Sequence, residues 1–198
     1  MLARDLIPEE FHSLRMLRLF LPVVNEPGAA IRWSALLPVG VELTASTNFY
    51  ELWALYSADH PGAVTPSPAL GSLDPLTAHS LRELLTTQLG PDQLLPTRSW
   101  AGYSRSSAPG MRTSMVNGQE YAHETLTIHE IIERGIKGIV PDFVADPGMA
   151  FAWGTCLYPD SLFIAAAPEL FRALHQDPFL DVASVLAHRD ILPQTFEG

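Results

Sequence analysis

The sequence predicts a single α+β domain in which about three helices pack on a mainly antiparallel sheet. Three observations favour this class. Segments with helical spacing of apolar residues are separated by groups of short strand-like segments, instead of alternating with single strands. The dipeptide Asn117-Gly118 is a hairpin signal that joins two of these segments directly. The 17 prolines among 198 residues indicate short elements and many loops.

The first expected helix covers residues 8–21. Pro8 suits the first position of a helix, and Glu9 and Glu10 suit the positive end of its dipole. Apolar residues then recur at helical spacing until Pro22 ends the helix.

Strand-like segments and a loop follow this helix. Residues 31–37 and 39–43 are predicted as strands on either side of a proline-containing turn. Residues 48–56 are apolar on nearly every face, and their aromatic content favours a buried strand, although their length alone does not exclude a short helix. Residues 60–73 contain three prolines and two glycines and form the longest expected loop within the domain 1–198.

The second half of the chain begins with a helix at residues 75–89, because Asp74 caps it, Pro75 suits its first position and Gly90 stops it. A strand centred on residues 100–103 is expected next. A hairpin follows, in which the first strand ends near residue 116 and the second runs from about 120 to 129. The last expected elements are strands at 149–157 and 161–166, a helix from 168 to 176, and a strand at 180–186.

The charge and composition exclude several classes of protein. The chain has 12 basic and 22 acidic residues, a net charge of −10, and no run of basic residues, so we expect no nucleic-acid partner. The single cysteine, Cys156, excludes an intrachain disulfide. About 18 consecutive apolar residues occur nowhere and the N-terminus lacks the pattern of a signal peptide, so we expect a cytoplasmic protein with no membrane partner.

Several short motifs resemble a family of uncharacterised proteins found widely in actinobacteria. The resemblance covers about residues 30–185 and implies no activity, cofactor or site. Its motifs, in chain order, are Ile31-Arg32-Trp33, Ser99-Trp100-Ala101-Gly102-Tyr103, Ala108-Pro109, Glu120-Tyr121, Trp153, Asp160-Ser161-Leu162-Phe163-Ile164-Ala165, Ala173-Leu174, Asp177-Pro178 and Leu180-Asp181-Val182. Asp181 stands where the family usually has a glutamate.

The densest cluster of titratable residues contains His123, His129, Glu130 and Glu133. If the segment is a strand, the two histidines lie about 20 Å apart and cannot share a metal ion. If it turns helical near His129, then His129 and Glu133 fall four residues apart on one helix face. Two ligands make an incomplete zinc site, so we expect no metal and no cofactor. These four residues are nevertheless the candidates for a catalytic role, with a polar strand face as the alternative.

Aromatic residues and a polar loop supply the candidates for binding. They are Trp100 and Tyr103, which could line a ligand pocket or simply fill the core, and Arg105, which lies in a serine-rich loop that could hold an anion.

The absence of a complete catalytic pattern favours a non-enzymatic binding or interaction protein, with a homodimer as one arrangement. Its expected partner is an unidentified protein or small molecule. One alternative is a small hydrolase-like enzyme with His123 or His129 as general base and Glu130 or Glu133 as its partner. Another is an immunity-type protein that neutralises a basic partner, because the charge of −10 would steer such a partner towards it.

Overall fold

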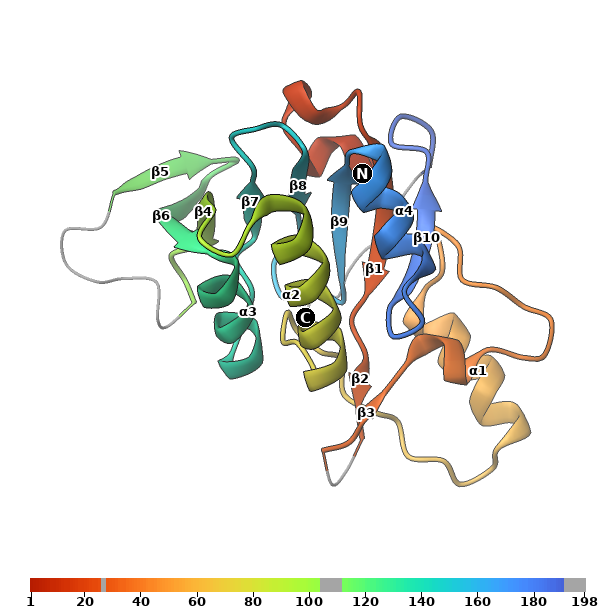
Figure 1. Cartoon of the computed structure of the whole chain (residues 1–198). Helices are drawn as coiled ribbons and strands as arrows, with labels where there is room; N and C mark the ends of the chain where they lie inside the picture. The colour runs from red at the N-terminus through yellow and green to blue at the C-terminus, as the bar shows by residue number, and fades with distance from the viewer. Residues whose placement is uncertain (26–27, 104–111, 191–198) are drawn as a thin grey trace.

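The computed structural model describes residues 1–25, 28–103 and 112–190, and these form one large sheet covered by helices. The strands of this sheet are β1 (Arg15–Phe20), β4 (Leu94–Trp100), β5 (Thr113–Val116), β6 (Gln119–Thr127), β7 (Phe143–Ala145), β8 (Phe151–Gly154), β9 (Ser161–Ala166) and β10 (Asp181–Val185). They lie in the order β10-β1-β9-β8-β7-β4-β6-β5, and every neighbouring pair is antiparallel (Figure 1). Strands β2 (Val23–Val24) and β3 (Ala30–Ile31) form a separate small pair.

The described residues form four α-helices and three short 3-10 helices. They are α1 (Phe49–Asp59), α2 (Pro75–Leu89), α3 (Ile128–Lys137), α4 (Pro168–Gln176), η1 (Ala3–Leu6), η2 (Glu9–Phe11) and η3 (Trp33–Leu36). Helices α2, α3 and α4 lie on one face of the large sheet, whereas α1 lies apart from them and packs against η3 (Figure 1). The predicted α+β class and antiparallel sheet are therefore confirmed, and the expectation of about three helices is roughly right.

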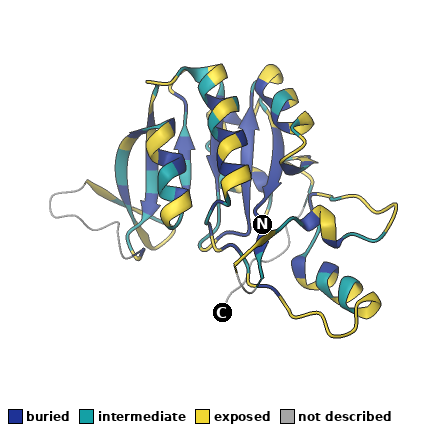
Figure 2. Cartoon of the chain, turned by 60° about the horizontal axis from the view of Figure 1, so that its bottom comes forward, coloured by how far each residue is buried: buried dark blue, intermediate teal, exposed yellow. Residues whose placement is uncertain are grey.

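The apolar core has three parts that follow from this layering. The largest lies between the sheet and α2, α3 and α4, and the helices turn their buried faces towards the sheet and their exposed faces outward (Figure 2). A second part lies on the opposite face of the sheet, beneath the N-terminal segment that contains η1 and η2. The third joins α1 and η3 to the ends of β1 and β10. The N-terminal segment therefore covers part of the helix-free face.

The helix expected at residues 8–21 is wrong, because residues 15–20 form strand β1. This strand lies between β10 and β9 in the sheet. Both faces of β1 are buried, with Leu17 and Leu19 facing the helices and Met16 and Phe20 on the other side. A strand buried on both sides is apolar at almost every position, so its residues also match helical spacing. The proline and acids at its start form only η2.

The strands expected at residues 31–37 and 39–43 are also wrong. Of this stretch, only Ile31 belongs to β3, and the next turn is η3. The indole nitrogen of Trp33 donates to the carbonyl of Leu21 at 2.8 Å, and its ring packs against Phe20 and Phe49. This anchor fixes a compact turn, after which residues 38–46 run as a loop without regular structure.

Residues 48–56, for which a buried strand was favoured, begin helix α1. The side chain of Asn48 accepts hydrogen bonds from the backbone N–H groups of Tyr50 and Glu51, and so caps the helix. The aromatic side chains of this segment stack on one another along the helix instead of filling two faces of a sheet.

The hairpin predicted at Asn117-Gly118 is confirmed, since it connects β5 to β6. The strand expected around residues 100–103 ends at Trp100, and residues 101–103 form a turn. The strand expected to reach residue 129 ends at Thr127, where α3 begins with a capping box between Thr127 and Glu130. Strand β7 was not expected.

The predictions that depended on strong local signals are confirmed. Asp74 caps α2 by accepting from two backbone N–H groups, and Pro75 is its first residue. Helix α4 begins at Pro168, β9 and β10 lie where strands were expected, and β8 is a shorter form of the strand expected at 149–157. Residues 60–73 contain no helix or strand of the large sheet. Within the described ranges, no helix is long and apolar enough to cross a membrane.

Candidate functional site

The helix-free face carries a row of polar side chains on β4, β6 and the residue before β5, and β7 lies beside this row. Arg98 on β4 is in register with His123 on β6 and with Phe143 on β7. The backbone N–H of His123 donates to the carbonyl of Arg112 at 2.8 Å, which places Arg112 beside it. Because residues in register share a face of the sheet, these side chains project on the same side. We call Arg98, His123 and Arg112 the arginine–histidine row.

Within the described residues, neither arginine of the row forms an ion pair with an acid. Among the residues that the structure describes, no carboxylate lies within ion-pair distance of either guanidinium. Arg98 is half-buried, with its guanidinium carbon 4.2 Å from the centre of the Phe143 ring. Burial lowers the pKa of Arg98, against the opposing influence of Tyr121 and Glu10. A groove of about 620 Å³ runs over the row, so both cations face an open space.

Among the described residues, the hydrogen-bond partner of the His123 ring is a serine. Its Nε2 lies 2.6 Å from the hydroxyl oxygen of Ser114 on β5, and the ring tautomer decides which of the two groups donates. Burial, followed by the positive charges of Arg98 and Arg112, lowers the pKa of His123 and so favours the neutral ring. This is the geometry of a general base beside a hydroxyl group. Within the described chain, however, no carboxylate hydrogen-bonds to the imidazole.

The binding candidates Trp100 and Tyr103 lie together around a buried carboxyl group, Asp142. The Tyr103 hydroxyl donates to Asp142 at 2.8 Å, and the backbone N–H of Trp100 donates to it at 2.6 Å. The rings of Trp100, Tyr103 and Tyr158 meet edge to face. Arg105, the third binding candidate, lies outside the described residues.

The pKa of Asp142 lies above the usual range for a carboxyl group. Burial raises its pKa to about 6, although the hydrogen bonds from Trp100 and Tyr103 favour the ionised form. Burial also raises the pKa of Tyr103, and the charge of Asp142 adds to this effect. A cavity of about 140 Å³ reaches Asp142, and Arg98 and Phe143 line both this cavity and the larger groove. The two spaces therefore meet at Arg98.

The other catalytic candidates lie on α3, and the structure does not bring them into the groove at His123. Glu130 accepts from the N–H and hydroxyl of Thr127 in the capping box. Glu133 forms ion pairs with Arg82 at 3.1 Å and Lys137 at 3.0 Å, and His129 is exposed in the first turn. The two glutamates are thus engaged by residues of α3, its N-cap and α2. Over residues 1–25, 28–103 and 112–190, no three histidine, cysteine or acidic side chains are arranged to hold a metal ion.

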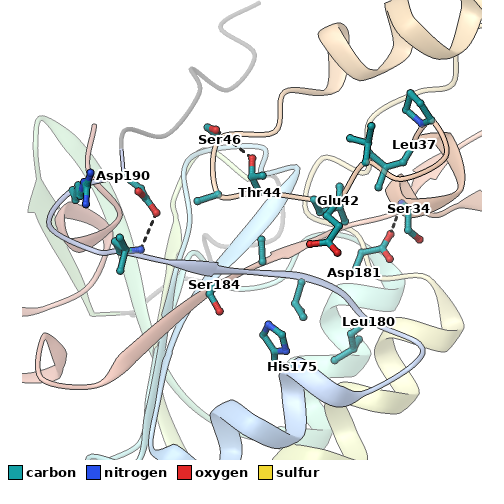
Figure 3. Close-up of a pocket in the computed structure, with 18 of the residues that line it drawn as sticks. Ser34, Leu37, Glu42, Thr44, Ser46, His175, Leu180, Asp181, Ser184 and Asp190 are labelled. Atoms are coloured by element: carbon teal, nitrogen blue, oxygen red, sulfur yellow. Dashed lines mark hydrogen bonds between the residues drawn. The ribbon is translucent and has the colours of Figure 1, made fainter.

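A larger cavity lies elsewhere, between the loop of residues 37–46 and strand β10. It measures about 1270 Å³ and is an open groove, which we call the β10 groove. Figure 3 shows Thr44, Ser46 and Glu42 on the loop side of this space, and Ser184 and His175 on the other. Strand β10 is the last strand of the sheet, so its outer edge has no strand partner among the described residues.

Sequence reasoning missed Ser114, Arg98, Arg112 and Asp142. Arg98 carried a weak signal, because it is a charged residue within a strand-like segment. The row itself depends on the register of three strands, and residues from 98 to 143 contribute to it. No pattern within one segment of the sequence indicates that register. The β10 groove depends likewise on which strand lies at the edge of the sheet.

Comparisons with protein-family models, with curated proteins and with solved structures found no match to this chain. The resemblance to the actinobacterial family therefore stays a prediction. Any function has to be argued from the two sites described above.

Proposed function

We propose that the protein is a binding protein that takes an extended, basic segment of a partner protein into the β10 groove. The single observation that carries the proposal is the open edge of β10 beside a groove of about 1270 Å³. The N–H and C=O groups on that edge offer main-chain hydrogen bonds to an added strand. This is a concrete form of the interaction protein that the sequence favours.

The side chains around the groove support a partner with alternating apolar and basic residues. Val39, Val41 and Leu186 line the groove and are more exposed than large apolar residues usually are, at 106%, 50% and 52%. They offer contacts to every second side chain of an extended segment.

Charge supports the basic character of the segment. The groove is lined by three carboxylates, those of Glu42, Asp181 and Asp190, and by one guanidinium, that of Arg189. Arg32 forms an ion pair with Asp181 at 3.1 Å, whereas Glu42 forms no ion pair within the described chain. The net charge of −10 would attract a basic segment from a distance. An immunity-type protein that neutralises a basic partner is one special case.

The test uses a synthetic peptide as long as β10, built from alternating valine and lysine and labelled for fluorescence anisotropy. We expect it to bind, to bind less well as salt is added, and to protect the amides of residues 181–185 from hydrogen exchange. The same peptide with alternate amides N-methylated should not bind, because it cannot complete the ladder of hydrogen bonds.

A charge reversal locates the site. Glu42→Lys should weaken binding about fivefold, since an exposed charge contact contributes up to about 1 kcal/mol. Glu83→Lys, on the exposed face of α2, makes the same change in net charge away from the groove and should have little effect. Equal effects of the two substitutions, or equal binding of the methylated peptide, would refute the proposal. So would a stable dimer of the chain, seen by sedimentation, whose contact protects residues 181–185 and excludes the peptide.

A further inference from the structure

The geometry points to a second binding site, independent of the β10 groove. We propose that the groove over Arg98, His123 and Arg112 binds the phosphate group of a small organic phosphate monoester. The argument has three steps, which concern the spacing of the donors, their charge, and the apolar walls beside them.

The spacing allows all three side chains to reach one anion. Neighbouring strands lie about 4.8 Å apart, so the Cα atoms of Arg98 and Arg112, two strands apart, are separated by about 10 Å. Arginine side chains are long enough to meet over His123, which lies between them. Ser114 contacts the His123 ring at Nε2, at 2.6 Å, and Nδ1 donates to an anion in the tautomer that carries the ring proton there. Two guanidinium groups and one imidazole thus form a set of donors suited to a tetrahedral oxyanion.

The charge of the row matches a dianion. Two guanidinium groups without an acidic partner in the described residues carry two positive charges in a protein whose net charge is −10. A phosphate monoester carries about −1.5 to −2 at pH 7. Two carboxylates also line the groove. Glu124 is held by Arg134 at 3.0 Å, and Glu10 is exposed.

The remaining walls suit an organic group attached to the phosphate. Pro8, Phe11 and Phe143 line the same groove as the row. Its volume, about 620 Å³, lies within the range of about 300–1,000 Å³ that is typical of small-molecule sites. A free phosphate ion would leave most of this space empty. The apolar walls therefore favour a ligand with an aromatic or aliphatic body.

The experiment follows the ring signals of His123 in NMR spectra of the full chain during titration with phenyl phosphate. The signals are assigned by their loss in His123→Asn. We expect a saturable shift of the His123 signals, and weaker binding of inorganic phosphate and of benzoate, which lack the organic body and the second charge respectively.

Two substitutions test residues of the groove, and a third is the control for net charge. Arg112 is exposed, so Arg112→Gln should leave the fold intact while weakening phenyl phosphate binding about tenfold. Arg172→Gln, on the exposed face of α4, removes the same charge elsewhere and should change binding less than about twofold. Glu10→Gln should tighten binding, because it removes the negative charge nearest to Arg98.

Three results would overturn the proposal. The first is the absence of a saturable shift at His123. The second is equal weakening by Arg112→Gln and Arg172→Gln, which would mean that the anion responds only to net charge. The third is binding of inorganic phosphate or benzoate as tight as that of phenyl phosphate, which would contradict the roles of the apolar walls and of the dianion.

Discussion

Arg18 is a fully buried cation in the middle of a strand, with only 1% of its surface exposed. Its guanidinium donates to the Ser161 hydroxyl at 2.7 Å, to the carbonyls of Ala45 and Thr47, and to the Asp160 carboxylate at 3.3 Å. Each of these bonds offsets part of the cost of removing the charge from water. The two carbonyls belong to the loop that borders the β10 groove, so Arg18 also fixes one wall of that site.

Removing the acid from this pair should destabilise the protein strongly. Asp160→Ala leaves the guanidinium of Arg18 buried without a counter-charge, and we expect the free energy of unfolding in urea to fall by about 3 kcal/mol. The double variant Arg18→Met, Asp160→Ala should be more stable than Asp160→Ala alone, because it removes the buried charge that Asp160→Ala leaves without a counter-charge. If the double variant is the less stable of the two, Arg18 stabilises the fold even without Asp160, and this account is incorrect.

The sequence shows Arg18 as a charge in an apolar segment, but it cannot show the acid that compensates it. Asp160 lies 142 positions along the chain and reaches Arg18 only because β1 pairs with β9. The same limit applies to the arginine–histidine row. His123 was a candidate from composition alone, whereas its neighbours Arg98 and Ser114 follow from strand register.

Among the elements, those with signals inside their own sequence were predictable and those defined by tertiary packing were not. Helix α2 carries its cap and its stop within the segment, and the β5–β6 hairpin carries its turn residues. Strand β1 and helix α1 are apolar on most faces, so their periodicity does not separate helix from strand. Strand β1 is favoured because both of its faces are buried in the sheet. Helix α1 is favoured because the Asn48 side chain caps its first turn.

Helix α3 contains a local signal that sequence reasoning overlooked, the capping box of Thr127 and Glu130. Thr127→Ala removes the side chain that accepts from the N–H of Glu130, and should lower the free energy of unfolding by about 1 kcal/mol. Thr87→Ala, at an exposed position in α2, is the matched control and should be neutral or slightly stabilising. Urea unfolding of both variants checks this. Equal effects would show that the cap does not stabilise α3.

At the scale of the whole molecule, Asp142 links segments that are distant in the sequence. It accepts hydrogen bonds from Trp100 at the end of β4 and from Tyr103 in the following turn, while its own backbone carbonyl accepts from the N–H of Thr155 after β8. It also borders the cavity that meets the groove at Arg98. Its ionisation therefore affects the junction between β4, β7 and β8 and not only one side chain.

Asp142 should make the free energy of unfolding decrease as the pH rises through the acidic range. Its pKa is about 6 in the folded protein and 3.8 in the unfolded chain, so the folded state binds more protons between these values. The contribution is most favourable below about pH 4, is lost as the pH rises towards 6, and amounts to about 3 kcal/mol. Glu124 acts oppositely, because its Arg134 partner lowers its pKa, so the pH profile of the wild type alone mixes both effects.

The difference between wild type and Asp142→Asn isolates the carboxyl group, because all other groups titrate in both proteins. We expect the free energy of unfolding of the variant, relative to wild type, to increase by about 3 kcal/mol from pH 3 to pH 8. Most of the change should fall between pH 4 and 6. Parallel profiles for the two proteins would mean that Asp142 has an ordinary pKa in the folded state. Its burial would then be offset by the hydrogen bonds from Trp100 and Tyr103, and the carboxylate would be a fixed anion beneath the arginine–histidine row.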